Sequence, residues 1–132
     1  MRPVPRILLV DDDVVQLGLY TQLLEIAGYR VEIAITASQT VCCMENAPAD
    51  LVIMDLRIPN ALGESDCLEG MALIRRIRDL GYRAPVIVLS GWPDDLYGQP
   101  EEQLVSCILV KPVGTRELLH TVRDLLDRAL AR

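Results

Sequence analysis

The side chains best suited to chemistry in this sequence stand directly after short apolar runs. They are four aspartates, a serine and a lysine: Asp11, Asp12, Asp13, Asp55, Ser90 and Lys111. Two carboxylates 4 Å apart would repel each other by roughly 4 kcal/mol at an effective dielectric constant near 20. A divalent cation would neutralise them, and a donor set made only of oxygens favours a hard ion such as Mg²⁺.

The serine and the lysine add what a bound phosphoryl group needs. Mg²⁺ usually keeps several water positions, which phosphoryl oxygens can take. A lysine ammonium offers a compact positive charge, and a serine hydroxyl offers a directional donor to the remaining oxygens. A carboxylate beside such an ion, with both of these groups, has the parts of an aspartyl-phosphate site.

Five apolar runs form the expected scaffold for these groups: residues 7–10, 31–35, 51–54, 86–89 and 108–110. They alternate with segments of helical periodicity, which is typical of a parallel sheet covered by helices on both faces. Because sites in such sheets lie outside the carboxyl ends of the strands, the polar groups should converge there. The second run alternates in polarity and should lie at an edge of the sheet.

Helices are predicted between the runs over residues 13–27, from Thr36 to before Pro48, over 69–80, and from Thr115 to about 129. In the first of them Val14, Leu17, Thr21 and Leu24 have helical spacing, and Gly28 fits a left-handed cap. The expected architecture is an α/β three-layer sandwich with right-handed crossovers.

Composition excludes several other classes of protein. A length of 132 residues suits a single domain, and 13 Lys and Arg against 19 Asp and Glu give a net charge of −6, which argues against direct nucleic-acid binding. The four cysteines, two of them adjacent, lack the spacing of a disulfide framework or a zinc site. No signal peptide or membrane span can be drawn, so we expect no membrane contact and a cytoplasmic location.

The order and spacing of four segments resemble those of the receiver domain of two-component response regulators. The segments are LLVDDD, VIMDLRIP, VIVLSG and ILVKP, and the resemblance covers about residues 6–129. The resemblance implies a CheY-like, flavodoxin-like (βα)5 fold with a five-stranded parallel sheet in the order 2-1-3-4-5. It also implies a signalling phosphoacceptor, not a metabolic enzyme. A histidine kinase or a histidine phosphotransfer protein would be the donor, and self-dephosphorylation would reset the switch. The partners would include a downstream protein and, in a homodimer, a second copy of the chain.

The resemblance assigns a role to each matching residue. The roles are Mg²⁺ binding for Asp11 and Asp12, phosphoacceptor and metal ligand for Asp55, metal ligation through the main-chain carbonyl for Arg57, switch hydroxyl for Ser90 and phosphate binding for Lys111. The bond between Lys111 and Pro112 is often cis in this family.

The sequence departs from the family pattern in three places. Residues 60–68 indicate an insertion of about seven residues, which is either a solvated loop or a lid or partner contact. The family's glycine at the start of the third helix matches Gly63 by loop count and Gly70 by its position in the helix. Residues 91–105, rich in Pro and Gly, predict an atypical fourth helix region, and Ile108 replaces the aromatic switch residue of the family.

Two bulky residues occupy family positions that flank the approach of water to the phosphoryl group. They are Arg57 and Trp92, and we expect them to slow hydrolysis. Trp92 and Tyr97 are either exposed anchors for a partner or a cover for the sheet edge.

The sequence is also compatible with two other functions. A pseudo-receiver would be an interaction module independent of phosphorylation, a reading motivated by Ile108 and the two irregular segments. A phosphatase resembling the haloacid dehalogenases would use Asp11 and Asp13 as a DxD pair.

Overall fold

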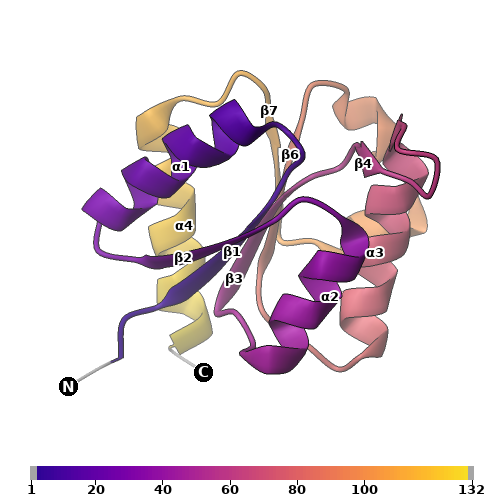
Figure 1. Ribbon diagram of the computed structural model, residues 1–132. Coiled ribbons are helices and arrows are strands. Elements are labelled where there is room, and N and C mark those ends of the chain that lie inside the picture. Colours follow the sequence, from indigo (N-terminus) through magenta and orange to yellow (C-terminus); the bar gives the residue numbers. More distant parts are fainter. Residues whose placement is uncertain (1–2, 131–132) are drawn as a thin grey trace.

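The computed structural model describes residues 3–130 and contains a central parallel sheet of five strands (Figure 1). The strands are β1 (Arg6–Val10), β2 (Arg30–Ala34), β3 (Leu51–Asp55), β6 (Val86–Ser90) and β7 (Cys107–Val110). Their spatial order is β2-β1-β3-β6-β7, and all four pairings are parallel. In order of appearance the five strands run 2-1-3-4-5, so the predicted fold class is confirmed.

Four α-helices cover the two faces of the sheet: α1 (Val14–Ile26), α2 (Ala37–Asn46), α3 (Cys67–Asp79) and α4 (Thr115–Leu130). Alternate residues of the central strands point to opposite faces and form two apolar clusters. One cluster joins Leu8 and Val52 to the buried residues of α2 and α3. The other joins Ile7 and Ile53 to those of α1 and α4. The result is the expected three-layer sandwich.

The helix starts are set by capping side chains. Asp13 caps α1 by accepting hydrogen bonds from the N–H groups of Val15 and Gln16. Thr36 caps α2 by accepting from Gln39 N–H, while the Gln39 side chain accepts from the N–H of Ile35. Gly28, with φ of +101°, adopts the left-handed conformation expected after α1.

The crossover between β6 and β7 contains no α-helix. Two 3₁₀ segments, η1 (Pro93–Asp95) and η2 (Pro100–Leu104), take the place of the fourth helix. Prolines begin both segments, and a proline cannot donate the main-chain hydrogen bond that a longer helix needs. The resemblance to a (βα)5 fold implies a fifth helix, which the described residues lack, and residues 91–105 are irregular instead.

The insertion after β3 folds into a short antiparallel hairpin made of β4 (Ile58–Pro59) and β5 (Ser65–Asp66). Its turn is organised by Asn60, whose side-chain oxygen accepts from the N–H groups of Leu62 and Glu64. Asp66 then caps α3, which begins at Cys67, two residues earlier than predicted. Residues 61–65 are exposed, so the hairpin tip lies at the surface.

The two candidate glycines around this hairpin have different structural roles. Gly63 lies in the turn with φ of +80°, and Gly70 lies in the first turns of α3, buried against the main chain of Leu56. Gly70 is therefore the residue that lets α3 approach the chain directly after β3.

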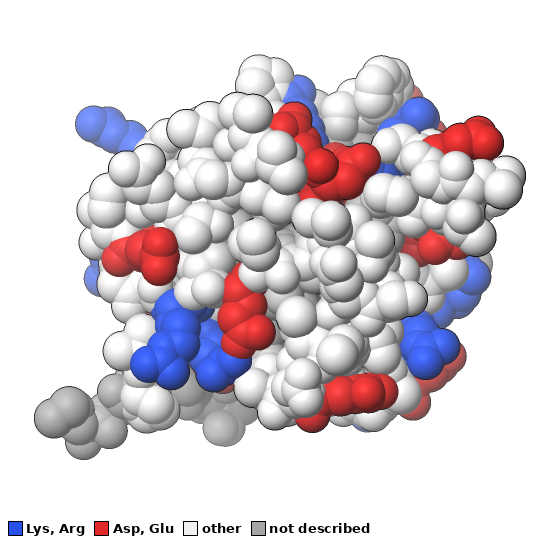
Figure 2. Space-filling model, viewed as in Figure 1, with Lys and Arg blue, Asp and Glu red and all other residues white. Residues whose placement is uncertain are grey.

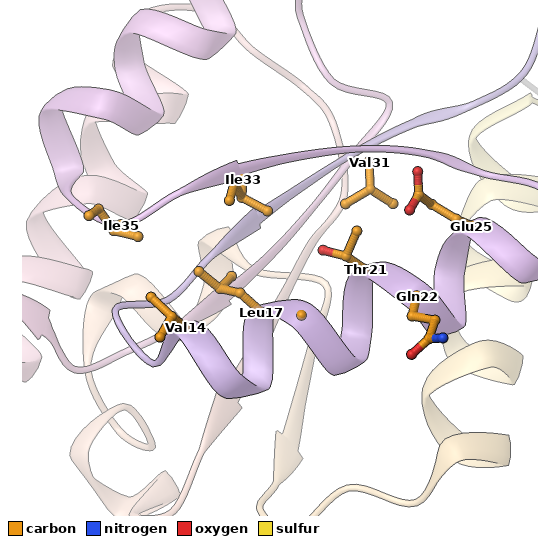
Figure 3. A pocket seen from close by; sticks show the side chains of 9 residues that line it. Val14, Leu17, Thr21, Gln22, Glu25, Val31, Ile33 and Ile35 are labelled. Carbon is orange, nitrogen blue, oxygen red and sulfur yellow. The ribbon is translucent and has the colours of Figure 1, made fainter.

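The edge strand β2 and helix α1 leave an open, mostly apolar groove between them (Figure 3). Val14, which the helical spacing grouped with Leu17 and Leu24, is 71% exposed at one end of this groove. Because β2 is the edge strand of the sheet, no further strand among residues 3–130 covers the first turn of α1, and this apolar position stays in contact with solvent. Within residues 3–130, none of the helices has the length and apolar content needed to cross a membrane.

Candidate functional site

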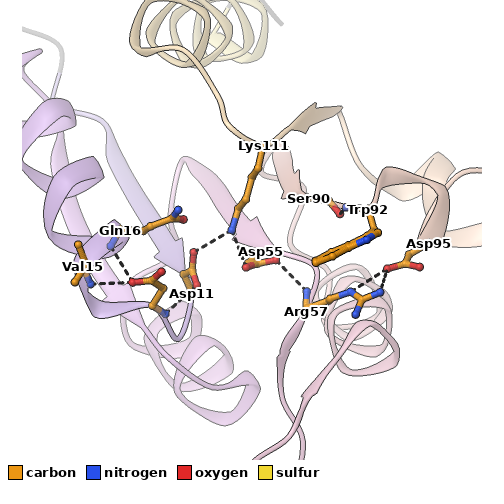
Figure 4. A network of polar contacts seen from close by, with 10 residues as sticks. Asp11, Val15, Gln16, Asp55, Arg57, Ser90, Trp92, Asp95 and Lys111 are labelled. Atoms are coloured by element: carbon orange, nitrogen blue, oxygen red, sulfur yellow. Dashed lines mark hydrogen bonds and ion pairs between the residues drawn. The ribbon is translucent and has the colours of Figure 1, made fainter.

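The carboxyl ends of β1, β3 and β7 bring two aspartates and a lysine together. Lys111 Nζ donates to Asp55 Oδ2 at 2.9 Å and lies 3.7 Å from Asp11 Oδ2 (Figure 4). Strand pairing explains the convergence, since β1 and β3 are neighbours and both aspartates stand at strand ends. The side chains of Asp11, Asp55 and Lys111 are 7%, 15% and 21% exposed. The convergence predicted for these three residues is thus observed.

The cluster carries more negative than positive charge. Two carboxylates face one ammonium group, and burial raises the pKa of Asp11, against the lowering effects of the Asp13 N–H and of Lys111. Burial by itself would lower the pKa of Lys111, but its hydrogen bond to Asp55 and the charges of Asp55 and Asp11 raise it. Lys111 is therefore firmly protonated at neutral pH, and the site can still take up positive charge.

The other two residues of the acidic run face outward. Asp12 and Asp13 are exposed, and Figure 2 shows acidic side chains at the surface where β1 meets α1. The carboxylate of Asp13 is engaged as the cap of α1, which removes it from the DxD pair of the rival phosphatase reading. Of the predicted metal-binding aspartates, Asp11 and Asp55 lie together and Asp12 does not join their ion-pair network.

Ser90 lies at the end of β6, only 1% exposed, and its hydroxyl oxygen accepts a hydrogen bond of 3.0 Å from the N–H of Trp92. The main chains of Ser90 and Lys111 are joined directly, because Lys111 N–H donates to the Ser90 carbonyl at 2.9 Å. The Lys111–Pro112 bond is cis, as the resemblance implies. The two predicted phosphate-binding residues are thus held side by side by adjacent strands.

Arg57 contacts the site through its main chain and a neighbouring cluster through its side chain. Its N–H donates to Asp55 Oδ1 at 3.1 Å. Its guanidinium donates to Asp95 Oδ2 from Nε at 3.1 Å and from Nη2 at 2.8 Å, and lies 4.5 Å from the centre of the Trp92 ring (Figure 4). Trp92 is itself 62% exposed, so its ring contacts Arg57 at the surface and does not cover the sheet edge.

The donor set fits a magnesium ion. The described residues hold no ready-made group of three Asp, Glu, His or Cys side chains close enough to bind a metal. Mg²⁺, however, is usually bound by one or two carboxylates and keeps several waters. The paired oxygens of Asp11 and Asp55, with an excess of negative charge, match that requirement. In the sequence, Asp12 is adjacent to Asp11, and Arg57, with its main-chain carbonyl, stands two residues after Asp55.

Sequence reasoning missed three residues around the cluster. Asp95 holds Arg57 from 38 positions away in the chain, in a segment without a regular pattern. Burial raises the pKa of the Tyr20 hydroxyl. The charge of Lys111 lowers this pKa, and the charges of Asp11 and Asp55 raise it. Gln16 extends toward Lys111, and its buried side-chain oxygen has no hydrogen-bond partner among the described residues (Figure 4). Gln16 and Tyr20 are four residues apart and therefore lie on one face of α1. This spacing is the sequence feature from which their position near the cluster could have been predicted.

Comparison with known proteins identifies the family. The response regulator receiver domain model matches residues 7–123. The uncharacterized transcriptional regulatory protein YbdJ of Bacillus subtilis is 34% identical over 92% of this chain, which covers 51% of that protein. The chain thus spans about half the length of this curated relative.

Two solved structures share the fold and part of the sequence. A CheY-like receiver domain from Methanospirillum hungatei superposes with a TM-score of 0.81 at 29% identity, covering 98% of both chains. The receiver domain of the sensor histidine kinase PA1611 from Pseudomonas aeruginosa, which has a magnesium ion in its active site cleft, superposes with a TM-score of 0.78 at 28% identity, covering 95% of this chain and 99% of that one. This chain belongs to the family of response regulator receiver domains.

Proposed function

We propose that Asp55 is the residue of this receiver domain that accepts a phosphoryl group from a phosphohistidine. The observation that supports the proposal is that the ammonium of Lys111 contacts the carboxylates of both Asp55 and Asp11 at the ends of three strands. In the transfer, Asp55 Oδ attacks phosphorus in line with the phosphorus–nitrogen bond of the donor. A phosphorus–oxygen bond forms, the phosphorus–nitrogen bond breaks, and the histidine nitrogen keeps the electron pair and takes up a proton.

Lys111 and Ser90 stabilise the charge on the transferred group. The ammonium of Lys111 already bonds Asp55 Oδ2, so it stands where the negative charge of a phosphoryl group would appear. The buried hydroxyl oxygen of Ser90 accepts from the N–H of Trp92 in this structure, and the side chain can rotate to donate its O–H to a phosphoryl oxygen. Phosphorylation adds about −1.5 to −2 charge, which draws both groups toward Asp55.

Asp11, Asp12, Asp55 and the main-chain carbonyl of Arg57 are the proposed holders of Mg²⁺. When bound, the ion neutralises the carboxylates and polarises the phosphoryl oxygens. The magnesium ion in the cleft of the PA1611 receiver supports this proposal. The protein's own contribution is to hold Asp11 and Asp55 close together and partly shielded from water, with the charged ammonium of Lys111 in contact with both.

The partners follow from the chemistry of the transfer. A histidine kinase or a histidine phosphotransfer protein donates the group, and a downstream protein or a linked output region reads the phosphorylated state. Hydrolysis of the acyl phosphate at the same site returns the domain to its resting state. We propose a location in the cytoplasm and no direct contact with nucleic acid.

A pseudo-receiver is the second candidate, and a specific observation favours it. Ile108 lies half-buried against the apolar cluster of α2 and α3, where the family has a rotating aromatic residue. A domain without that residue could bind a partner in one fixed state.

Phosphotransfer separates the two candidates. The chain and its Asp55→Asn variant are each mixed with candidate kinases carrying a labelled phosphohistidine, with and without Mg²⁺. Transfer of label to the wild type alone, and only with Mg²⁺, supports the receiver function. Failure of the whole set to label the folded wild type, together with failure of acetyl phosphate to do so, favours the pseudo-receiver.

A further inference from the structure

The Arg57 side chain lies beside the phosphorylation site but is bound away from it. The main-chain N–H of Arg57 bonds Asp55, whereas the guanidinium bonds Asp95 of η1 and stacks on Trp92. One residue therefore connects the phosphoacceptor loop with the 3₁₀ segment that replaces the fourth helix.

The contact between Arg57 and Asp95 is of a kind that a stronger anion can displace. The side chains of the pair are 39% and 25% exposed, and ion pairs in contact with solvent are weak. Both hydrogen bonds from the guanidinium go to a single oxygen of Asp95, so the fork is not paired with both carboxylate oxygens. A phosphoryl group has three acceptor oxygens and up to two negative charges, and a guanidinium can bind two of those oxygens at once.

We propose that Arg57 is a phosphoryl-binding residue that changes partners when Asp55 is phosphorylated. The guanidinium leaves Asp95 and the Trp92 ring and binds the phosphoryl oxygens, which releases η1. This inference rests on the proposed function of Asp55 and adds the route by which the phosphorylated state reaches the surface.

A second contact makes the release of Trp92 cooperative. The N–H of Trp92 donates to Ser90 Oγ, and the Trp92 ring stacks on Arg57. When the Ser90 side chain rotates so that its Oγ leaves the Trp92 N–H, and the guanidinium of Arg57 turns toward the phosphoryl group, Trp92 loses both partners in one event. Ile108 cannot rotate a polar group into the site, so this exchange takes over the task of an aromatic switch.

The test measures Mg²⁺-dependent binding of beryllofluoride, a phosphoryl mimic, to the wild type and three variants. Asp95→Asn removes the competing charge with little change in shape. Asp94→Asn is the matched control, because Asp94 lies on the same 3₁₀ turn and is exposed, and Arg57 bonds Asp95 instead. Arg57→Lys keeps the charge but loses the planar fork.

Affinity is read by fluorine NMR, which does not depend on tryptophan, and the state of Trp92 is read by its emission. Trp92 is the single tryptophan of the chain, so the emission has one source. Far-UV circular dichroism confirms that each variant is folded.

Asp95→Asn is expected to bind beryllofluoride about two to five times more tightly than the wild type, the range of a surface ion pair that no longer competes. Its emission without ligand should already be shifted toward that of the bound wild type. Asp94→Asn should match the wild type in both readouts, and Arg57→Lys should bind at least about twofold more weakly.

Three results would overturn the inference while leaving the proposed function intact. They are equal affinities for Asp95→Asn and Asp94→Asn, wild-type emission that beryllofluoride does not change, and undiminished affinity in Arg57→Lys. A folded wild type that binds no beryllofluoride with Mg²⁺ would instead overturn the proposed function and this inference together.

Discussion

Replacing Gly70 by alanine should destabilise the protein, because α3 lies directly against the chain that follows the phosphoacceptor. A Cβ atom at this position would be 1.9 Å from the carbonyl oxygen of Leu56, 2.7 Å from its carbonyl carbon and 2.9 Å from its Cα. The nearest pair must separate by about 1.1 Å, from 1.9 Å to the 3.0 Å below which Cβ contacts essentially never occur. All three atoms belong to the main chain, so no side-chain rotation can relieve the clash.

The cost follows from the rigidity of this region. Inserting a methyl group into a filled interior typically costs 1–3 kcal/mol, and the main-chain clash places Gly70→Ala near about 3 kcal/mol. With a urea m-value of roughly 1–3 kcal/mol/M, the unfolding midpoint should fall by about 1 M or more. Leu56 is the neighbour of Asp55, so the same displacement should also slow phosphoryl acceptance.

Gly18→Ala is the matched control for this measurement. Gly18 lies in the middle of α1, and a Cβ there would meet no atom within 4 Å. Alanine is favoured over glycine in a helix by about 0.5–1 kcal/mol, so this variant should be slightly more stable than the wild type. A Gly70→Ala protein as stable as the wild type, or an equal loss of stability in Gly18→Ala, would refute the reasoning.

Three further predictions concern the charged cluster. Burial raises the pKa of Asp11, so its contribution to stability is present at acid pH and is lost as the pH rises through the folded pKa. The stability of Asp11→Asn should therefore increase relative to that of the wild type as the pH rises above 3.8 in metal-free urea titrations, and a difference independent of pH would contradict this. Lys111→Met should accept a phosphoryl group from acetyl phosphate roughly a hundredfold more slowly, measured as an initial rate, and an unchanged rate would remove Lys111 from the site. Arg57→Asn should lose its phosphoryl group faster than the wild type in a time course of phosphoprotein mass, whereas equal or slower loss would argue against shielding from water.

Much of the site was predictable because strand ends are easy to locate in this sequence. The apolar runs end at Val10, Asp55 and Val110 in the structure, within one residue of their predicted ends. In a parallel sheet the carboxyl ends of the strands lie at one edge, so the order of the runs was enough to bring Asp11, Asp55 and Lys111 together.

The features that were not predictable depend on irregular segments or on the edge of the sheet. The pair of Arg57 and Asp95 joins a loop to a 3₁₀ turn that has no periodic pattern, so its partner could not be found by spacing. The exposure of Val14 depends on how much of α1 the edge strand covers, and helical spacing carries no information on that. The hairpin of residues 58–66 depends on the side-chain bonds of Asn60, which a count of inserted residues cannot reveal.

The most direct measurement of the central claim is the intact mass of the protein after incubation with acetyl phosphate, with and without Mg²⁺, followed by location of the modified residue. If Asp55 accepts the phosphoryl group, the mass of the wild type should increase by that of one phosphoryl group, and only with Mg²⁺. The modification should be located at Asp55, and a folded Asp55→Asn variant should not gain this mass. Modification at Asp11, or a wild type that gains no mass while it remains folded and binds Mg²⁺, would contradict it.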